Sequence, residues 1–175
     1  DTSALMEGTM GWYYTTDGGV TWSGRDTMPS HTNLAHFMGD PTVAIDLAGN
    51  LFVGGIYNDS YIFADRSTNG GFTWTHTAAY STNSGYHRPH LTIDTNPFSA
   101  NKDNVYLAST WVLFSRSTNV SQAFSTPVSM GGSIGAWRKV GPRLALSPDS
   151  AVYATWSGYD ATSGQPIRLG FNRST

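Results

Sequence analysis

The chain contains no cysteine, and charged residues occupy only 13% of its 175 positions. Without thiols it can form neither disulfides nor thiolate metal sites. The formal net charge is −2 and no run of basic residues is present, which argues against a nucleic-acid-binding surface. No apolar stretch approaches the roughly 20 residues of a membrane-spanning helix. We therefore expect neither a nucleic-acid partner nor a transmembrane segment.

Amphipathic helices are also missing from the pattern, since no sustained i, i+3, i+4 spacing of apolar residues is bounded by helix caps. Hydrophobic residues nevertheless make up 39% of the chain, and aromatic residues 13%. This content is sufficient for a packed core and argues against disorder. The sequence therefore predicts an ordered all-β protein.

Two eight-residue stretches, 15–22 and 67–74, both read Ser/Thr-x-Asp/Asn-x-Gly-x-Thr-Trp. Their glycine pairs supply the positive φ that tight hairpin turns require. Asp17 and Asn69 can accept hydrogen bonds from backbone amides of their own turns. We expect the closing residues Trp22 and Trp74 to be largely buried, each with a partner for its ring N–H. The residues assigned to this structural motif are Thr15, Asp17, Gly19, Thr21, Trp22, Ser67, Asn69, Gly71, Thr73 and Trp74.

A longer repeat surrounds these turns. Similar segments begin at Pro41, Pro89 and Pro142, about 50 residues apart, which is the period of a propeller blade. In each unit a second strand follows, a third leads to the turn position and a fourth leaves it. The repeat predicts four-stranded antiparallel sheets over 41–78 and 89–128.

These motifs resemble those of the sialidase-type Asp-box (bacterial neuraminidase repeat, BNR) β-propeller family, and the resemblance covers nearly the whole chain. It implies four-stranded antiparallel blades with Asp-box hairpins, here in one partial propeller domain over 1–175. The implied units are an outer hairpin with its loop (1–39), a second blade (40–87), a third blade (88–140) and three strands of a fourth (141–175).

Closed propellers have about 4–8 blades, so we interpret the chain as part of a longer protein. The alternative is a small closed propeller of three blades, in which the first hairpin pairs with the last unit.

Three residues at the entrances of the inner strands, Asp40, Arg88 and Arg143, are candidates for substrate binding. The resemblance implies that they face the central channel at one rim, where an arginine cluster holds a substrate carboxylate. Bidentate pairing between guanidinium and carboxylate suits arginine to that role. The family also uses a Tyr–Glu nucleophile pair and an acid/base Asp, but the only glutamate is Glu7, which is poorly placed. No catalytic set is assigned, and the alternative is that both arginines bond carbonyls of neighbouring blades.

Aromatic residues near the same rim can either stack on sugar rings or fill the interfaces between blades. The sequence favours packing between blades for Trp111 and Trp156 and leaves both options open for Tyr57 and Tyr159. Tyr57 is included among the substrate-binding candidates.

The histidines show no metal-ligand pattern. His87 and His90 flank a proline at a strand start, so they lack the geometry of a helical zinc pair. We expect no metal and no cofactor.

Two functions remain open. One is a secreted or cell-surface, sialidase-like module that binds glycans or other surface proteins within a larger protein, together with the remainder of its own propeller. The alternative is a glycoside hydrolase, exo-sialidase-like, with catalytic residues partly outside this segment. The Asp boxes do not discriminate, because in the family they lie on the outer edge. We favour the binding module and expect an extracellular or cell-surface location in a bacterium.

Overall fold

The computed structural model describes residues 10–26, 37–57, 61–81, 87–118, 123–131, 137–160 and 162–174. These residues form an all-β structure in which the one helical element is a 3-10 turn, η1 (Thr110–Val112). Within the described ranges there is no helix with the length and apolar character needed to cross a membrane.

The strands form four antiparallel sheets, in which neighbours in sequence are neighbours in space. They are the hairpin β1 (Trp12–Tyr14) and β2 (Ser23–Arg25); the sheet β3 (Phe37–Ile45), β4 (Leu51–Tyr57), β5 (Tyr61–Ser67) and β6 (Thr75–Ser81); the sheet β7 (His90–Ile93), β8 (Val105–Ser109), β9 (Leu113–Ser117) and β10 (Val128–Ser129); and the sheet β11 (Trp137–Leu146), β12 (Val152–Asp160) and β13 (Pro166–Arg173). The predicted fold class, built from four-stranded antiparallel sheets, is confirmed.

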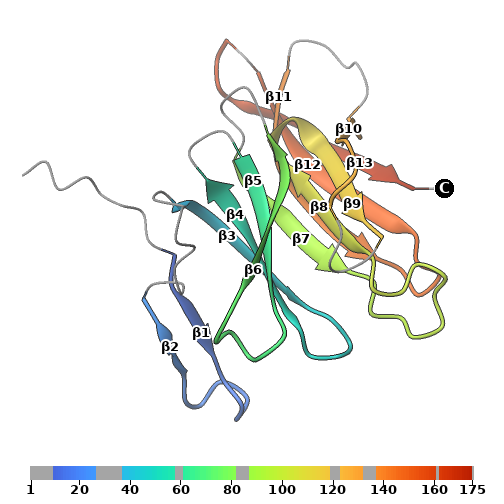
Figure 1. The fold of residues 1–175 in the computed structure, drawn as a ribbon. Coiled ribbons are helices and arrows are strands. Elements are labelled where there is room, and N and C mark those ends of the chain that lie inside the picture. Colours follow the sequence, from blue (N-terminus) through green and yellow to red (C-terminus); the bar gives the residue numbers. More distant parts are fainter. Residues whose placement is uncertain are drawn as a thin grey trace, which may run out of the picture.

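The sheets lie next to one another in chain order, from the β1–β2 hairpin at one end to the β11–β13 sheet at the other (Figure 1). The first strands of the three larger sheets are neighbours, since β7 contacts both β3 and β11. In the described part of the chain, β1 and β2 pair only with each other. The alternative of a closed three-blade propeller is therefore not formed in this structure.

Apolar side chains fill the spaces between successive sheets. One cluster, which includes Phe52, Ile62 and Leu107, joins the β3–β6 sheet to the β7–β10 sheet. A second, which includes Leu144 and Ala154, joins the β7–β10 sheet to β11–β13. Successive side chains of a strand point to opposite faces of the sheet, so one sheet can contribute side chains to both clusters. This packing fixes the relative positions of the sheets.

Both turns of the repeated motif are held by their own polar side chains. Asp17 accepts hydrogen bonds from the amides of Val20 (3.0 Å) and Thr21 (2.9 Å), and Asn69 accepts one from the amide of Thr73 (2.9 Å). These are hydrogen bonds of the kind expected for the motif. Each of these bonds joins residues of the same turn.

The burial expected for Trp22 is wrong, because 60% of its surface is exposed. In the described part of the chain, the β1–β2 hairpin lies at one end of the row of sheets, so no further sheet covers the Trp22 ring (Figure 1). Trp74 is half-buried and packs edge to face against Trp12, with 6.5 Å between ring centroids. Both ring N–H groups have a partner, because they donate to the carbonyls of Gly19 and Gly71.

Neighbouring inner strands are joined by a repeated hydrogen bond. The amide of Leu91 donates to Thr42 Oγ1 (3.1 Å), and the amide of Leu144 donates to His90 Nδ1 (3.1 Å). Thr42 and His90 both directly follow the first proline of their repeat. The same position therefore links each sheet to the next one.

Candidate functional site

The residue before each repeated proline has an unusual backbone conformation. Asp40, Arg88 and Gly141 have φ values of 51°, 58° and 62°, in the left-handed region. A residue before proline normally adopts extended backbone, and non-glycine residues seldom have positive φ. Pairing in β3 and β11 is shifted at these positions, as in a β-bulge. Bulges of this kind often lie beside functional sites, where they redirect side chains.

These bulges bring Asp40 and Arg88 together. The amide of Arg88 donates to Asp40 Oδ2 (2.8 Å), and His87 Nδ1 lies 3.5 Å from the same oxygen. The Asp40 carboxylate thus fixes the backbone at the entrance to β7. This contact leaves the Arg88 side chain to extend in the direction of the next sheet, where a Cβ added to Gly141 would lie 3.8 Å from Arg88 Cδ.

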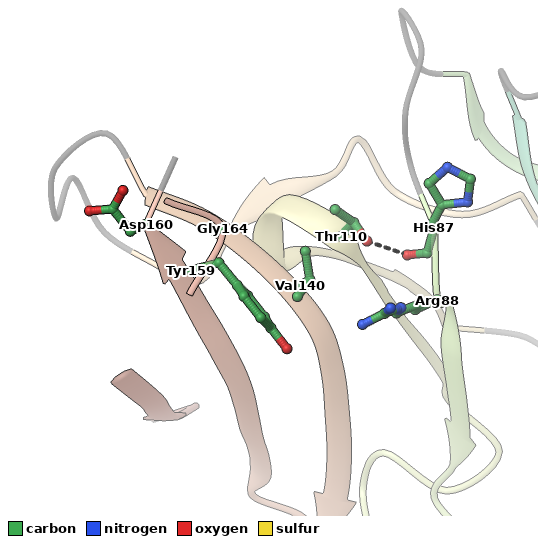
Figure 2. Close-up of a pocket in the computed structure, with 7 residues that line it drawn as sticks. All are labelled: His87, Arg88, Thr110, Val140, Tyr159, Asp160 and Gly164. Atoms are coloured by element: carbon green, nitrogen blue, oxygen red, sulfur yellow. Dashed lines mark hydrogen bonds between the residues drawn. The ribbon is translucent and has the colours of Figure 1, made fainter. Parts of the chain in front are cut away.

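A cavity of about 330 Å³ lies at this rim, between the β7–β10 and β11–β13 sheets. One side is formed by residues at the start of β7 and in the β8–β9 turn, and the other by the end of β12 and the turn after it. The lining residues are His87, Arg88, Thr110, Val140, Tyr159, Asp160 and Gly164. Figure 2 shows the Arg88 guanidinium and the Tyr159 phenol directed toward the same space, whereas the His87 ring and the Asp160 carboxylate point away from it.

The charge available inside this cavity is positive. Within the described part of the chain, the Arg88 guanidinium has no hydrogen-bond or ion-pair partner. The Asp160 carboxylate accepts hydrogen bonds from the amides of Ser163 and Thr162, and these bonds hold its pKa below the ordinary value. It is thereby committed to its own turn. The Thr110 hydroxyl is likewise committed, because it donates to the carbonyl of His87. The cavity therefore offers a free guanidinium and a phenol, which suit an anionic ligand.

The other two candidates for substrate binding do not line this cavity. Arg143 donates to the carbonyl of Pro142 (3.1 Å), one residue away, and among the described residues it makes no hydrogen bond to a carbonyl of a neighbouring sheet. Tyr57 is half-buried, packs against a cluster that includes Phe63, and lies 5.9 Å from the ring of Tyr61. The structure thus unites Asp40 with Arg88 and places Arg143 and Tyr57 outside the cavity lining.

The aromatic residues near the rim have different environments. Tyr159 lines the cavity. Trp156 is half-buried and packs between sheets, as the sequence favours. Trp111 differs from that expectation, because 42% of its surface is exposed. The other two residues of its turn, Thr110 and Val112, are buried, so the exposure is confined to Trp111 itself.

Several residues that line the cavity were not predicted from the sequence. Thr110, Val140 and Gly164 are of types that occur throughout a β protein, and Asp160 reads as an ordinary turn residue. Their only signal is position, because Thr110, Asp160 and Gly164 lie at strand ends or in turns at one rim, and Val140 lies at the irregularity of β11.

No pair of carboxylates lines the cavity among the described residues, although most glycoside hydrolases use such a pair. Glu7 lies outside the described residues. No group of three or more potential metal ligands occurs within the described ranges. The described lining is therefore equipped for binding an anion, and it does not by itself contain a glycosidase acid and base.

Comparison with solved structures agrees with this architecture, whereas no protein-family model and no curated protein matches the chain. Among solved structures it is similar to the GH93 α-L-arabinofuranosidase of Fusarium graminearum in complex with arabinobiose, with a TM-score of 0.69 and 15% identity over 94% of this chain and 54% of that one. It is also similar to the intramolecular trans-sialidase from Ruminococcus gnavus in complex with oseltamivir carboxylate, with a TM-score of 0.58 and 16% identity over 93% of this chain and 37% of that one.

The chain has the fold of part of a β-propeller. At this level of identity the likeness concerns the fold alone. The chain spans about half the length of the arabinofuranosidase and a smaller share of the trans-sialidase.

Proposed function

We propose that this chain is a glycan-binding β-propeller module whose ligand carries a carboxylate. The observation that carries the proposal is the Arg88 guanidinium, which faces a cavity at the rim without a protein partner in the described residues. A guanidinium can donate two parallel hydrogen bonds to a carboxylate, a geometry that a neutral sugar hydroxyl cannot match. The ligand class is therefore acidic sugars.

The remaining groups of the cavity fit a sugar. Tyr159 supplies a hydroxyl group, and Val140 supplies an apolar wall. Ligand pockets commonly combine such apolar walls with a few polar groups that fix orientation. The cavity volume of about 330 Å³ is at the small end of the usual range, which fits one sugar unit.

A second candidate function is glycoside hydrolysis of the exo-sialidase type. It is supported by the fold of the structural neighbours, whose printed descriptions name an arabinofuranosidase and a trans-sialidase. Under this proposal the acid, base or nucleophile comes at least in part from residues outside the described cavity lining. A secreted or cell-surface location in a bacterium belongs to both proposals.

A glycan array tests the binding function. We expect the protein to retain sialylated or uronic acid glycans in preference to neutral ones, and Arg88→Gln to lose that retention. Arg143→Gln is the matched control, because this arginine lies outside the cavity lining and should leave retention unchanged. If both variants bind as well as the parent protein, the ligand site does not include Arg88 and the proposal is wrong.

The hydrolase alternative is tested with a broad panel of chromogenic sialosides and arabinofuranosides. Turnover by the parent protein that is lost in Arg88→Gln would establish the hydrolase. If the protein is retained on the array but turns over none of these substrates, the binding function is supported and the hydrolase is not.

A further inference from the structure

The turn between β8 and β9 has a strained backbone. Ser109 and Leu113 pair across the two strands, so the turn consists of three residues, 110–112. Two of them, Trp111 (φ 69°) and Val112 (φ 57°), lie in the left-handed region. Tight turns normally place Asn or Gly in such positions, and a β-branched residue there is an outlier. Strain of this kind persists only where the surroundings enforce it, and it is concentrated at ligand sites.

Contacts on both sides enforce this turn. Thr110 donates its amide (3.0 Å) and its hydroxyl (2.5 Å) to the carbonyl of His87. Val112 is fully buried, and its carbonyl accepts a hydrogen bond from the amide of Met130 (2.9 Å). The turn also packs against β11. The backbone of Trp111 is thus fixed relative to His87, which lines the Arg88 cavity.

The side chain of Trp111 is only partly covered by the protein. Although indole is the largest apolar side chain, 42% of this residue is exposed. In Figure 2, Thr110 and Arg88 lie on one side of the cavity and Tyr159 on the other. Trp111 is the next residue in the chain after Thr110, so its backbone lies within one residue of the cavity lining.

We propose that Trp111 stacks on the apolar C–H face of a sugar ring whose carboxylate is bound by Arg88. The inference rests on the proposed glycan-binding function and deepens it, because it makes the site selective for cyclic acidic sugars over open-chain carboxylates. An indole offers a wide, rigid face with few rotatable bonds, so little conformational freedom is lost on binding. A smaller residue in the same turn would relieve strain and lose that face.

The test compares binding and stability in the same variants. Trp111→Asn places a residue that tolerates positive φ in the turn, which offsets part of the packing lost with the indole, so the melting temperature should fall only modestly and the variant should stay folded at the temperature of the titration. Its affinity for N-acetylneuraminic acid and glucuronic acid, measured by calorimetric titration, should fall by about tenfold or more, as for other lost aromatic stacking contacts. Trp111→Phe should retain most of the affinity. Phe98→Ala removes another exposed aromatic side chain (95% exposed), in the β7–β8 loop, and should change neither property.

Saturation-transfer NMR supplies a readout that a structural role would not produce. With the parent protein, the C–H protons on one face of the sugar ring should receive saturation, and Trp111→Asn should abolish this pattern. The proposal is overturned if Trp111→Asn keeps its affinity while Arg88→Gln loses it, a result that leaves the proposed function intact. If the parent protein binds neither acid, both proposals fail.

Discussion

Replacement of Trp74 by alanine should destabilise the protein clearly more than the same replacement of Trp22. The two residues occupy equivalent positions in the repeated turn, and each donates its ring N–H to a glycine carbonyl. They differ in packing, because Trp74 lies against Trp12 and a cluster that includes Phe63, whereas Trp22 is 60% exposed. The pair therefore separates the contribution of burial from that of the turn.

The magnitudes follow from the buried area. A tryptophan side chain presents roughly 200 Å². Since 60% of Trp22 is exposed, about 80 Å² is buried, which at roughly 25 cal/mol/Å² contributes at most about 2 kcal/mol. Truncation of a well-packed aromatic residue costs about 3–5 kcal/mol. Because Trp74 is half-buried, we expect a loss near the lower end of that range.

Urea unfolding followed by far-UV circular dichroism measures both losses without relying on tryptophan fluorescence. The reasoning is refuted if Trp22→Ala costs as much as Trp74→Ala. A loss below about 1 kcal/mol for Trp74→Ala, within the range of neutral surface changes, would show that this residue does not anchor its turn.

Three further predictions concern an inter-sheet contact, the binding site and the turns. Burial holds the pKa of His90 below its ordinary value, and the neutral ring accepts a hydrogen bond from the amide of Leu144. Thermal stability should therefore fall as the pH drops below about 6.5, because the unfolded chain takes up the proton first, and His90→Gln should flatten this dependence. Gly141→Asp should abolish acidic-sugar binding in titration calorimetry by pairing with Arg88, whereas Gly141→Asn should retain it. Asp17→Asn should change the melting temperature less than Asp17→Ala, because asparagine holds the second turn through the same side-chain oxygen.

The fold was predictable because each repeat contains residues that specify its turns and strands locally. Glycine pairs with Asp17 or Asn69 specify a hairpin turn, and the short, nearly continuous apolar runs around Phe52 and Leu107 indicate strands that are buried on both faces. Each of these signals depends only on residues that are close together in the sequence. The burial of Trp22 could not be obtained in this way, because it depends on how many strands cover the hairpin.

The candidate site was predictable only in part. Arg88 and Asp40 share a repeat position, so their common location at one rim follows from the alignment. Their positive φ values do not, because a residue before proline ordinarily avoids that region. The exposure of Trp111 depends on the strained turn before β9, and no local sequence signal marks a Trp-Val pair as left-handed.

Calorimetric titration of the methyl glycoside of N-acetylneuraminic acid and of its methyl ester tests the central claim most directly. The two ligands differ only in the carboxylate charge that Arg88 is proposed to bind. We predict that the acid binds the parent protein at least about tenfold more tightly than the ester, as expected for a charged hydrogen-bonded pair, and that Arg88→Gln removes this difference. Equal affinity for the acid and the ester, or a preference that persists in Arg88→Gln, would contradict the account.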